Sequence, residues 1–128
     1  MNTATAPAVT TTTPIPLNPG ELYVGLATDP EGKSVHHVVL LPGDVEKNWH
    51  DAKAWAAAIG GELPTRTEAL LLFHTQRAEF QRTWYWTSQQ HAAGPSYAWY
   101  QSFFWGYQDY GLVLSFERRA RAVRRAPL

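Results

Sequence analysis

The chain has 128 residues, with 11 basic and 11 acidic side chains, so its net formal charge is zero. This balance argues against nonspecific nucleic-acid binding, which needs a basic surface, and no apolar run is long enough to span a bilayer. The sequence contains no cysteine, which excludes disulfides, thiolate zinc sites and cysteine nucleophiles.

Residues 1–19 form a leader rich in threonine and proline, and we expect the folded domain to span residues 20–128. This composition cannot bury enough apolar surface to offset the entropy of ordering. The leader is either a disordered tail or an arm that becomes ordered along a partner, anchored by Ile15 and Leu17. It has neither the basic start nor the apolar run of a secretory signal, so we expect the protein in a virion or in the bacterial cytoplasm.

The domain is predicted to open with a β-hairpin. Residues 21–28 and 34–41 are rich in β-favouring side chains, and the turn-like sequence Asp29-Pro30-Glu31-Gly32 separates them.

A first helix follows the hairpin, because apolar side chains recur at intervals of three and four residues. These side chains are Trp49, Ala52, Ala56 and Ile59. Asn48 is the favoured N-cap and Asp44 is its rival. The pair Gly60-Gly61 supplies the permissive backbone at which a helix ends.

Thr65 and Glu68 form a capping box that predicts a second helix. It carries Leu70, Leu71 and Phe73, and we expect it to end near Glu79.

Strands are predicted over residues 84–88 and 97–104, with a turn region over residues 106–111. Residues 112–116 and 121–124 then form one long or two short closing strands. The order of hairpin, two helices and antiparallel strands indicates an α+β fold.

An ordered set of motifs resembles one known family. It begins with Trp49-x-x-Ala52-x-x-Trp55-Ala56 and Gly60-Gly61-Glu62-Leu63-Pro64-Thr65-Arg66-x-Glu68. It continues with Tyr85-Trp86-Thr87-Ser88, Ala98-Trp99-Tyr100-Gln101-x-Phe103, Gly106-x-Gln108 and Ala120-Arg121-Ala122-Val123-Arg124-Arg125. Over residues 21–125 the chain is similar to the Lcl C-terminal domain family, and its hairpin to the phage-encoded members.

The resemblance implies a C-type-lectin-like fold and a role as a displayed binding module. Relatives in that family occur in bacterial adhesins, in phage tail and particle proteins, and as diversified binding domains of retroelements. In the diversified relatives the binding residues fall in the C-terminal half.

The central motif also has a physical interpretation as a corner between two helices. We expect a structural role for Trp49, Gly60, Gly61, Pro64, Thr65, Glu68, Trp86 and Trp99, with the tryptophans in the core.

No motif predicts catalysis, a metal or a cofactor. The patterns of a nucleophile elbow and of a phosphate-binding loop are missing, and we expect a protein that is not an enzyme. His36 and His37 are adjacent in a strand and point to opposite faces, and His50, His74 and His91 lack ligand spacing. Asp109 alone among residues 89–110 has a carboxylate, too few for a calcium-dependent sugar site.

Aromatic side chains crowd the C-terminal half. In the strand over residues 97–104, Tyr97, Trp99 and Gln101 should share one face, opposite Ala98 and Tyr100. One of these sets must leave the core unless both faces are covered. We therefore expect a ligand-binding surface formed by Tyr97, Trp105, Tyr107, Gln108, Asp109 and Tyr110.

Five arginines lie near the C-terminus: Arg118, Arg119, Arg121, Arg124 and Arg125. They bind an anionic partner, cover the solvent face of a closing strand, or pair with Glu62, Glu68 and Glu117.

We expect a non-catalytic binding module of a phage virion or tail, whose partner is a host-surface or particle protein. A structural or decoration subunit of the particle, and a soluble intracellular inhibitor of a host protein, are the alternatives. A homo-oligomer is compatible with each of these roles.

Overall fold

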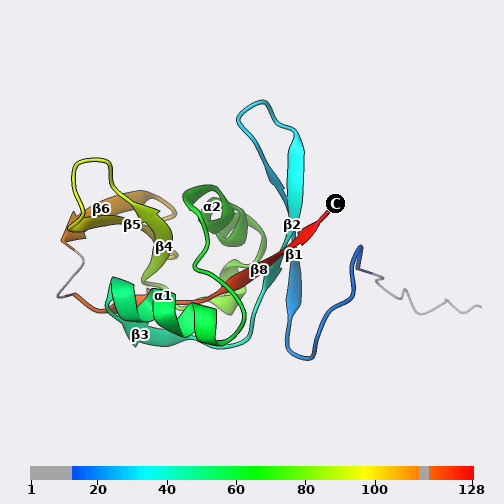
Figure 1. Ribbon diagram of the computed structural model, residues 1–128, viewed down its shortest axis with the longest axis horizontal. Coiled ribbons are helices and arrows are strands. Elements are labelled where there is room, and N and C mark those ends of the chain that lie inside the picture. Colours follow the sequence, from blue (N-terminus) through cyan, green and yellow to red (C-terminus); the bar gives the residue numbers. More distant parts are fainter. Residues whose placement is uncertain (1–12, 113–115) are drawn as a thin grey trace, which may run out of the picture.

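The hairpin and the end of the chain form one sheet in the computed structural model, which describes residues 13–112 and 116–128. Strand β1 (Leu22–Thr28) pairs antiparallel with β2 (Ser34–Leu40), which confirms the predicted hairpin. The last strand, β8 (Val123–Pro127), pairs antiparallel with the other edge of β2. The resulting order β1-β2-β8 places both ends of the domain in a three-stranded sheet (Figure 1).

Helix α1 (Trp49–Ala58) begins where the sequence predicts. The side chain of Asn48 accepts a hydrogen bond from the backbone N–H of Asp51, so Asn48 and not Asp44 is the N-cap. Trp49, Ala52 and Ala56 are buried as expected. The prediction for Ile59 is wrong, because this residue is the C-cap beyond the last helical turn and its exposed fraction is 40%.

Helix α2 (Arg66–Thr75) has the predicted capping box, in which Thr65 accepts from the backbone N–H of Glu68 and Glu68 accepts from that of Thr65. The helix ends four residues before the predicted Glu79. A short 3₁₀ turn, η1 (Arg77–Glu79), follows it and leads into the central strands.

The second sheet has five strands within the described residues, in the order β3-β7-β4-β5-β6. They are β3 (Val45–Lys47), β4 (Trp84–Gln90), β5 (Tyr97–Ser102), β6 (Gln108–Leu112) and β7 (Arg118–Ala120). All neighbours are antiparallel except β4 and β7, which run parallel. Together the two helices and two sheets confirm the α+β class.

One prediction for this sheet is wrong, and another is refined. The expected turn over residues 106–111 is a strand from Gln108 onward, because β6 pairs with β5 along its whole length. The chain closes with two short strands, which was one of the two predicted alternatives, but their bounds differ from the predicted 112–116 and 121–124: β7 lies in this sheet and β8 in the three-stranded sheet. Residues 113–115 lie outside the described residues.

The five-stranded sheet separates two apolar cores. Trp86 and Tyr100 pack with Trp49 of α1, whereas Tyr85 and Phe103 pack with Leu72 of α2 and with the three-stranded sheet. Adjacent residues of one strand thus enter different cores, as strand geometry requires. Trp49 and Trp86 are core residues as predicted, and their indole N–H groups donate to the carbonyls of Thr87 and Lys47.

Candidate functional site

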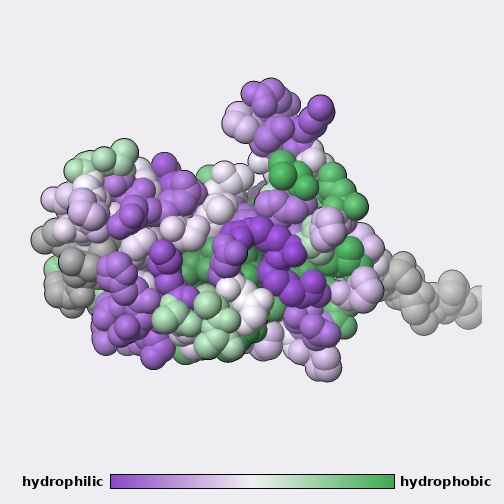
Figure 2. Space-filling view, in the orientation of Figure 1, coloured by the Kyte–Doolittle hydropathy of each residue, from purple (hydrophilic) through white to green (hydrophobic). Residues whose placement is uncertain are grey.

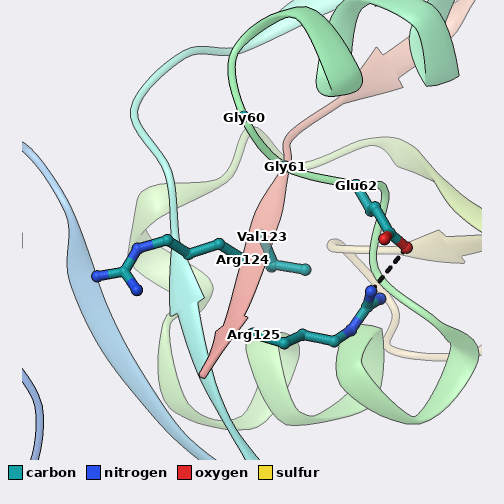
Figure 3. A pocket seen from close by; sticks show the side chains of 6 residues that line it. All are labelled: Gly60, Gly61, Glu62, Val123, Arg124 and Arg125. Carbon is teal, nitrogen blue, oxygen red and sulfur yellow. Dashed lines mark hydrogen bonds and ion pairs between the residues drawn. The ribbon is translucent and has the colours of Figure 1, made fainter. Parts of the chain in front are cut away.

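The corner between α1 and α2 borders a cavity of about 270 Å³, lined by Gly60, Gly61, Glu62, Val123, Arg124 and Arg125 (Figure 3). Gly61 lies so close to β8 that a Cβ atom would stand 2.6 Å from the carbonyl oxygen of Val123. Arg124 and Arg125 point in opposite directions from β8, and Arg125 donates to Glu62 (Figure 3). The motif therefore positions a helix corner against the closing strand.

Both arginines of this cavity are already paired within the chain. Arg124 donates to both carboxylate oxygens of Glu21 and to the carbonyl oxygen of Pro16. Arg125 holds Glu68 with two nitrogens, at 2.7 and 2.8 Å. Because these donors are engaged, the cavity offers little to an anionic ligand.

Glu68 is the centre of this charge network. Its exposed fraction is 1%, and its carboxylate accepts from Arg125, from the backbone N–H of Thr65 and from Nε2 of His36. Burial by itself would raise the pKa of the Glu68 carboxyl, but hydrogen bonds from Arg125, Thr65 and His36 outweigh it and hold the pKa to about 2. Three residues thus hold the Glu68 carboxylate in its charged form, and it stabilises the fold by linking α2 to strands β2 and β8.

Two further C-terminal arginines also bind inward. Arg119 pairs with Asp44, which in turn accepts from the hydroxyl of Tyr85. Burial and this hydrogen bond to Asp44 raise the pKa of Tyr85. Arg121 is buried and donates to the carbonyl oxygens of Leu41 and Glu79. The pairing of Arg125 with Glu62 and Glu68 is confirmed, while Arg121 does not cover a solvent face.

The predicted binding residues fall into three places rather than one. Tyr97 and Tyr110 lie together on one face of the sheet, because β5 and β6 pair Trp99 with Tyr110. Trp105 lies in the turn between the two strands with an exposed fraction of 70%. Tyr107 packs edge-on against Trp84, on the side of the sheet that carries Tyr100, and is 52% exposed.

The face with Tyr97 and Tyr110 is completed by two residues outside the predicted set. The ring of His91 stacks on Tyr110 at 3.7 Å between centroids, and Trp99 meets both rings. Trp99 was expected in the core, but it is only half-buried because its side chain leaves the sheet on this outer face. The result is a continuous aromatic cluster beyond the start of α2.

Arg66 borders this cluster and changes the interpretation of Gln108. The guanidinium of Arg66 lies 3.6 Å from the centroid of the Trp99 ring, and its Nε donates to Oε1 of Gln108. The amide of Gln108 donates to the carbonyl of Arg66 and to Gln101. The side-chain amide of Gln108 is therefore engaged in hydrogen bonds within the fold, and its ligand-binding role stays a prediction. Asp109 is exposed, and its Oδ1 accepts from the backbone N–H of Tyr110.

A groove that sequence reasoning missed lies beside Trp105. Its volume is about 510 Å³, and it is lined by Arg77, Ala78, Phe80, Arg82, Phe103 and Phe104. The walls come from two segments more than 20 residues apart, so no local pattern marks them together. The only local hint of this groove in the sequence is the pair Arg77 and Arg82 on either side of Phe80.

Apolar residues also reach the surface at the opposite end of the molecule, beside the hairpin and the C-terminus (Figure 2). Leu26, Val35 and Leu128 are exposed there. These side chains are aliphatic, whereas the end with β5 and β6 combines aromatic rings with arginines. Aromatic and arginine side chains are the ones enriched at protein interfaces, so the β5–β6 end is the stronger candidate.

Among the described residues, no three histidine or acidic side chains gather as a metal site would require. Neither α1 nor α2, the α-helices of the described chain, has the length and apolar character needed to cross a bilayer. Comparison with family models, with curated proteins and with solved structures finds no match to this chain.

Proposed function

We propose that this chain is a non-catalytic binding domain that contacts a partner protein through the aromatic residues of the β5–β6 end. The observation that carries the proposal is the exposure of four aromatic side chains in seven residues of sequence: Phe104, Trp105, Tyr107 and Tyr110. Water contact with so much aromatic surface is unfavourable, and burial against a partner would recover that free energy.

The location of the side chains with shifted pKa values favours a binding function over a catalytic one. Glu21, Glu68 and Tyr85 have shifted pKa values, and each takes part in hydrogen bonds that join distant parts of the frame. The groups that usually reveal an active site are therefore committed to structure.

A C-type-lectin-like fold and display on a phage particle or tail belong to the same proposal. They rest on the resemblance of residues 21–125 to the Lcl C-terminal domain family. The element order of hairpin, two helices and antiparallel strands is the one that this proposal requires. The partner is then a host-surface protein or another protein of the particle.

The test begins with quantitative mass spectrometry of purified phage particles and of the lysate of the producing cell. A fixed stoichiometry in particles is expected. The double variant Trp105→Ala, Tyr107→Ala should then leave the particle composition unchanged and abolish adsorption to the host. Val35→Ala, at the opposite end of the molecule, is the matched control and should adsorb normally.

Two outcomes would change the proposal. If the double variant is lost from otherwise intact particles, the aromatic surface binds particle subunits and the domain is a decoration subunit. If the unaltered protein stays wholly in the lysate, its place on the particle is wrong.

A further inference from the structure

The groove beside Trp105 has an apolar floor that is already packed. Phe80 and Phe103 stack with ring planes 7° apart and centroids 3.9 Å apart, and both are buried. Tyr85 packs edge-on against each ring from below. The floor is therefore rigid, and an apolar side chain placed on it would find a preformed surface.

One wall of the groove is fixed by a glycine that cannot be replaced without movement. Gly106 has a φ of 91°, and a Cβ atom there would lie 2.7 Å from the ring of Phe73. This close approach holds the turn after β5 against α2 and sets the position of Phe104. The groove is thus a feature of the folded chain and needs no partner to form.

The rim carries two arginines, Arg77 and Arg82, whose positive charge is not neutralised. The guanidinium of Arg77 lies over the ring of Phe73 and its Nε donates to the carbonyl oxygen of that residue. The guanidinium of Arg82 lies over Phe104 at 4.4 Å from the ring centroid. Within the described residues, neither arginine joins an ion pair with a carboxylate.

Three arginines near the C-terminus differ from Arg77 and Arg82, because they are paired with carboxylates. Arg119, Arg124 and Arg125 each bind a carboxylate of the chain. Aromatic contact orients Arg77 and Arg82 but leaves their terminal nitrogens free of any acceptor among the described residues. Two oriented forks on one apolar groove match carboxylates that flank an apolar group.

We propose, building on the proposed function, that this groove binds a segment of the partner protein in which acidic side chains flank an apolar anchor. The anchor lies on Phe80 and Phe103, and the flanking carboxylates pair with Arg77 and Arg82. Phe104 and Trp105 extend the contact beyond the rim. A nucleic acid fits less well, because the chain has no net charge and polyanion binding depends on an extended basic surface.

The test uses three fluorescein-labelled octapeptides and the full-length protein. The first has leucine and phenylalanine at its centre with aspartates on both sides, the second has lysines in place of the aspartates, and the third has serines in place of the apolar pair. Fluorescence anisotropy should show binding of the first peptide only. Raising the salt concentration from 50 to 500 mM should weaken that binding, because the arginines lie at an exposed rim.

The double variant Arg77→Gln, Arg82→Gln should weaken binding of the first peptide about tenfold and remove most of its salt dependence. The matched control is Lys33→Gln, Lys53→Gln, which removes the same charge from exposed positions that do not line the groove and should bind like the unaltered protein. Both variants change exposed side chains, and equal Tm values would show that both are folded.

Several results would overturn the groove proposal. The proposal fails if the serine peptide or the lysine peptide binds as tightly as the first peptide, or if a single-stranded oligonucleotide binds more tightly. It also fails if Lys33→Gln, Lys53→Gln weakens binding of the first peptide as much as Arg77→Gln, Arg82→Gln does. If none of these peptides binds while Trp105→Ala, Tyr107→Ala still abolishes adsorption, the groove proposal fails and the proposed function stands. If the first peptide binds selectively but the protein is absent from particles, the groove proposal stands and the proposed place of the protein on the particle fails.

Discussion

Replacement of Glu68 by glutamine tests the charge network that ties the second helix to the closing strand. The carboxylate is buried and accepts two hydrogen bonds from Arg125 and one from His36. Glutamine has nearly the same shape and keeps one oxygen for the capping box with Thr65. The change therefore removes charge while leaving the packing largely intact.

The expected cost follows from the pKa of Glu68. A decrease from the ordinary value of 4.5 to about 2 means that the fold favours the ionised form over the neutral form by roughly 3 kcal/mol. Loss of one partner from a buried ion pair has a cost of the same order. With an m-value of about 1.5 kcal/mol/M, the urea midpoint of Glu68→Gln should fall by about 2 M.

Glu62→Gln is the matched control, because Glu62 pairs with the same arginine at 2.7 Å but its side chain is 68% exposed. Water screens that pair, so we expect a loss of less than about 1 kcal/mol. Equal losses for the two variants would refute the idea that burial decides the strength of these contacts.

The pH dependence provides a second check on the same variant. The folded pKa of Glu68 lies below the unfolded value, so its stabilising effect is complete above pH 4.5 and is lost as the pH falls from 4.5 toward 2. The difference in unfolding free energy between the unaltered protein and Glu68→Gln should therefore shrink over that interval. A difference that stays constant between pH 7 and pH 2.5 would show that lost packing, and not lost charge, causes the effect.

Three further variants test separate features. Gly61→Ala should lower the free energy of unfolding, measured by urea titration, by about 2 kcal/mol or more, because its Cβ would meet the backbone of Val123. Gly94→Ala is the control: its Cβ meets nothing closer than 3.9 Å, and the loss should be less than about 1 kcal/mol. Arg121→Met should destabilise by about 2–4 kcal/mol, since the buried guanidinium bonds two backbone carbonyls that would lose their donors, and a Tm unchanged by the substitution would contradict this. Trp105→Ser should leave the Tm within a few degrees of the unaltered value, because the indole is mostly exposed, and a large drop in a thermal scan would place this side chain in the frame.

Local signals in the sequence predicted the helices well. The capping box of Thr65 and Glu68 and the cap at Asn48 depend on residues three apart in the chain, and both are confirmed. The turn predicted in place of strand β6 was wrong because the strand depends on a contact with another part of the chain. Its residues include Asp109 and Gly111, which are typical of turns, and it is a strand because β5 lies beside it.

The candidate site was predictable only in part. Exposure of Trp105 and Tyr107 followed from the excess of aromatic residues over what one core can hold. The role of Gln108 was not predictable, because its partners Arg66 and Gln101 are brought to it by helix and sheet packing. The groove was missed for the same reason.

The placement of arginines separates the frame of this protein from its candidate binding surface. Arg119, Arg121, Arg124 and Arg125, in and between the closing strands, bind groups that lie 42 to 108 residues earlier in the chain, so they tie the C-terminal segment to earlier elements. Carboxylates of the chain neutralise the charge of Arg119, Arg124 and Arg125. The two arginines at the groove, Arg77 and Arg82, have no such partner among the described residues, and the net charge of zero does not reveal this difference. A chain with no net charge can in this way present a locally cationic aromatic surface, and the acidic, apolar partner segment proposed for the groove depends on that local charge.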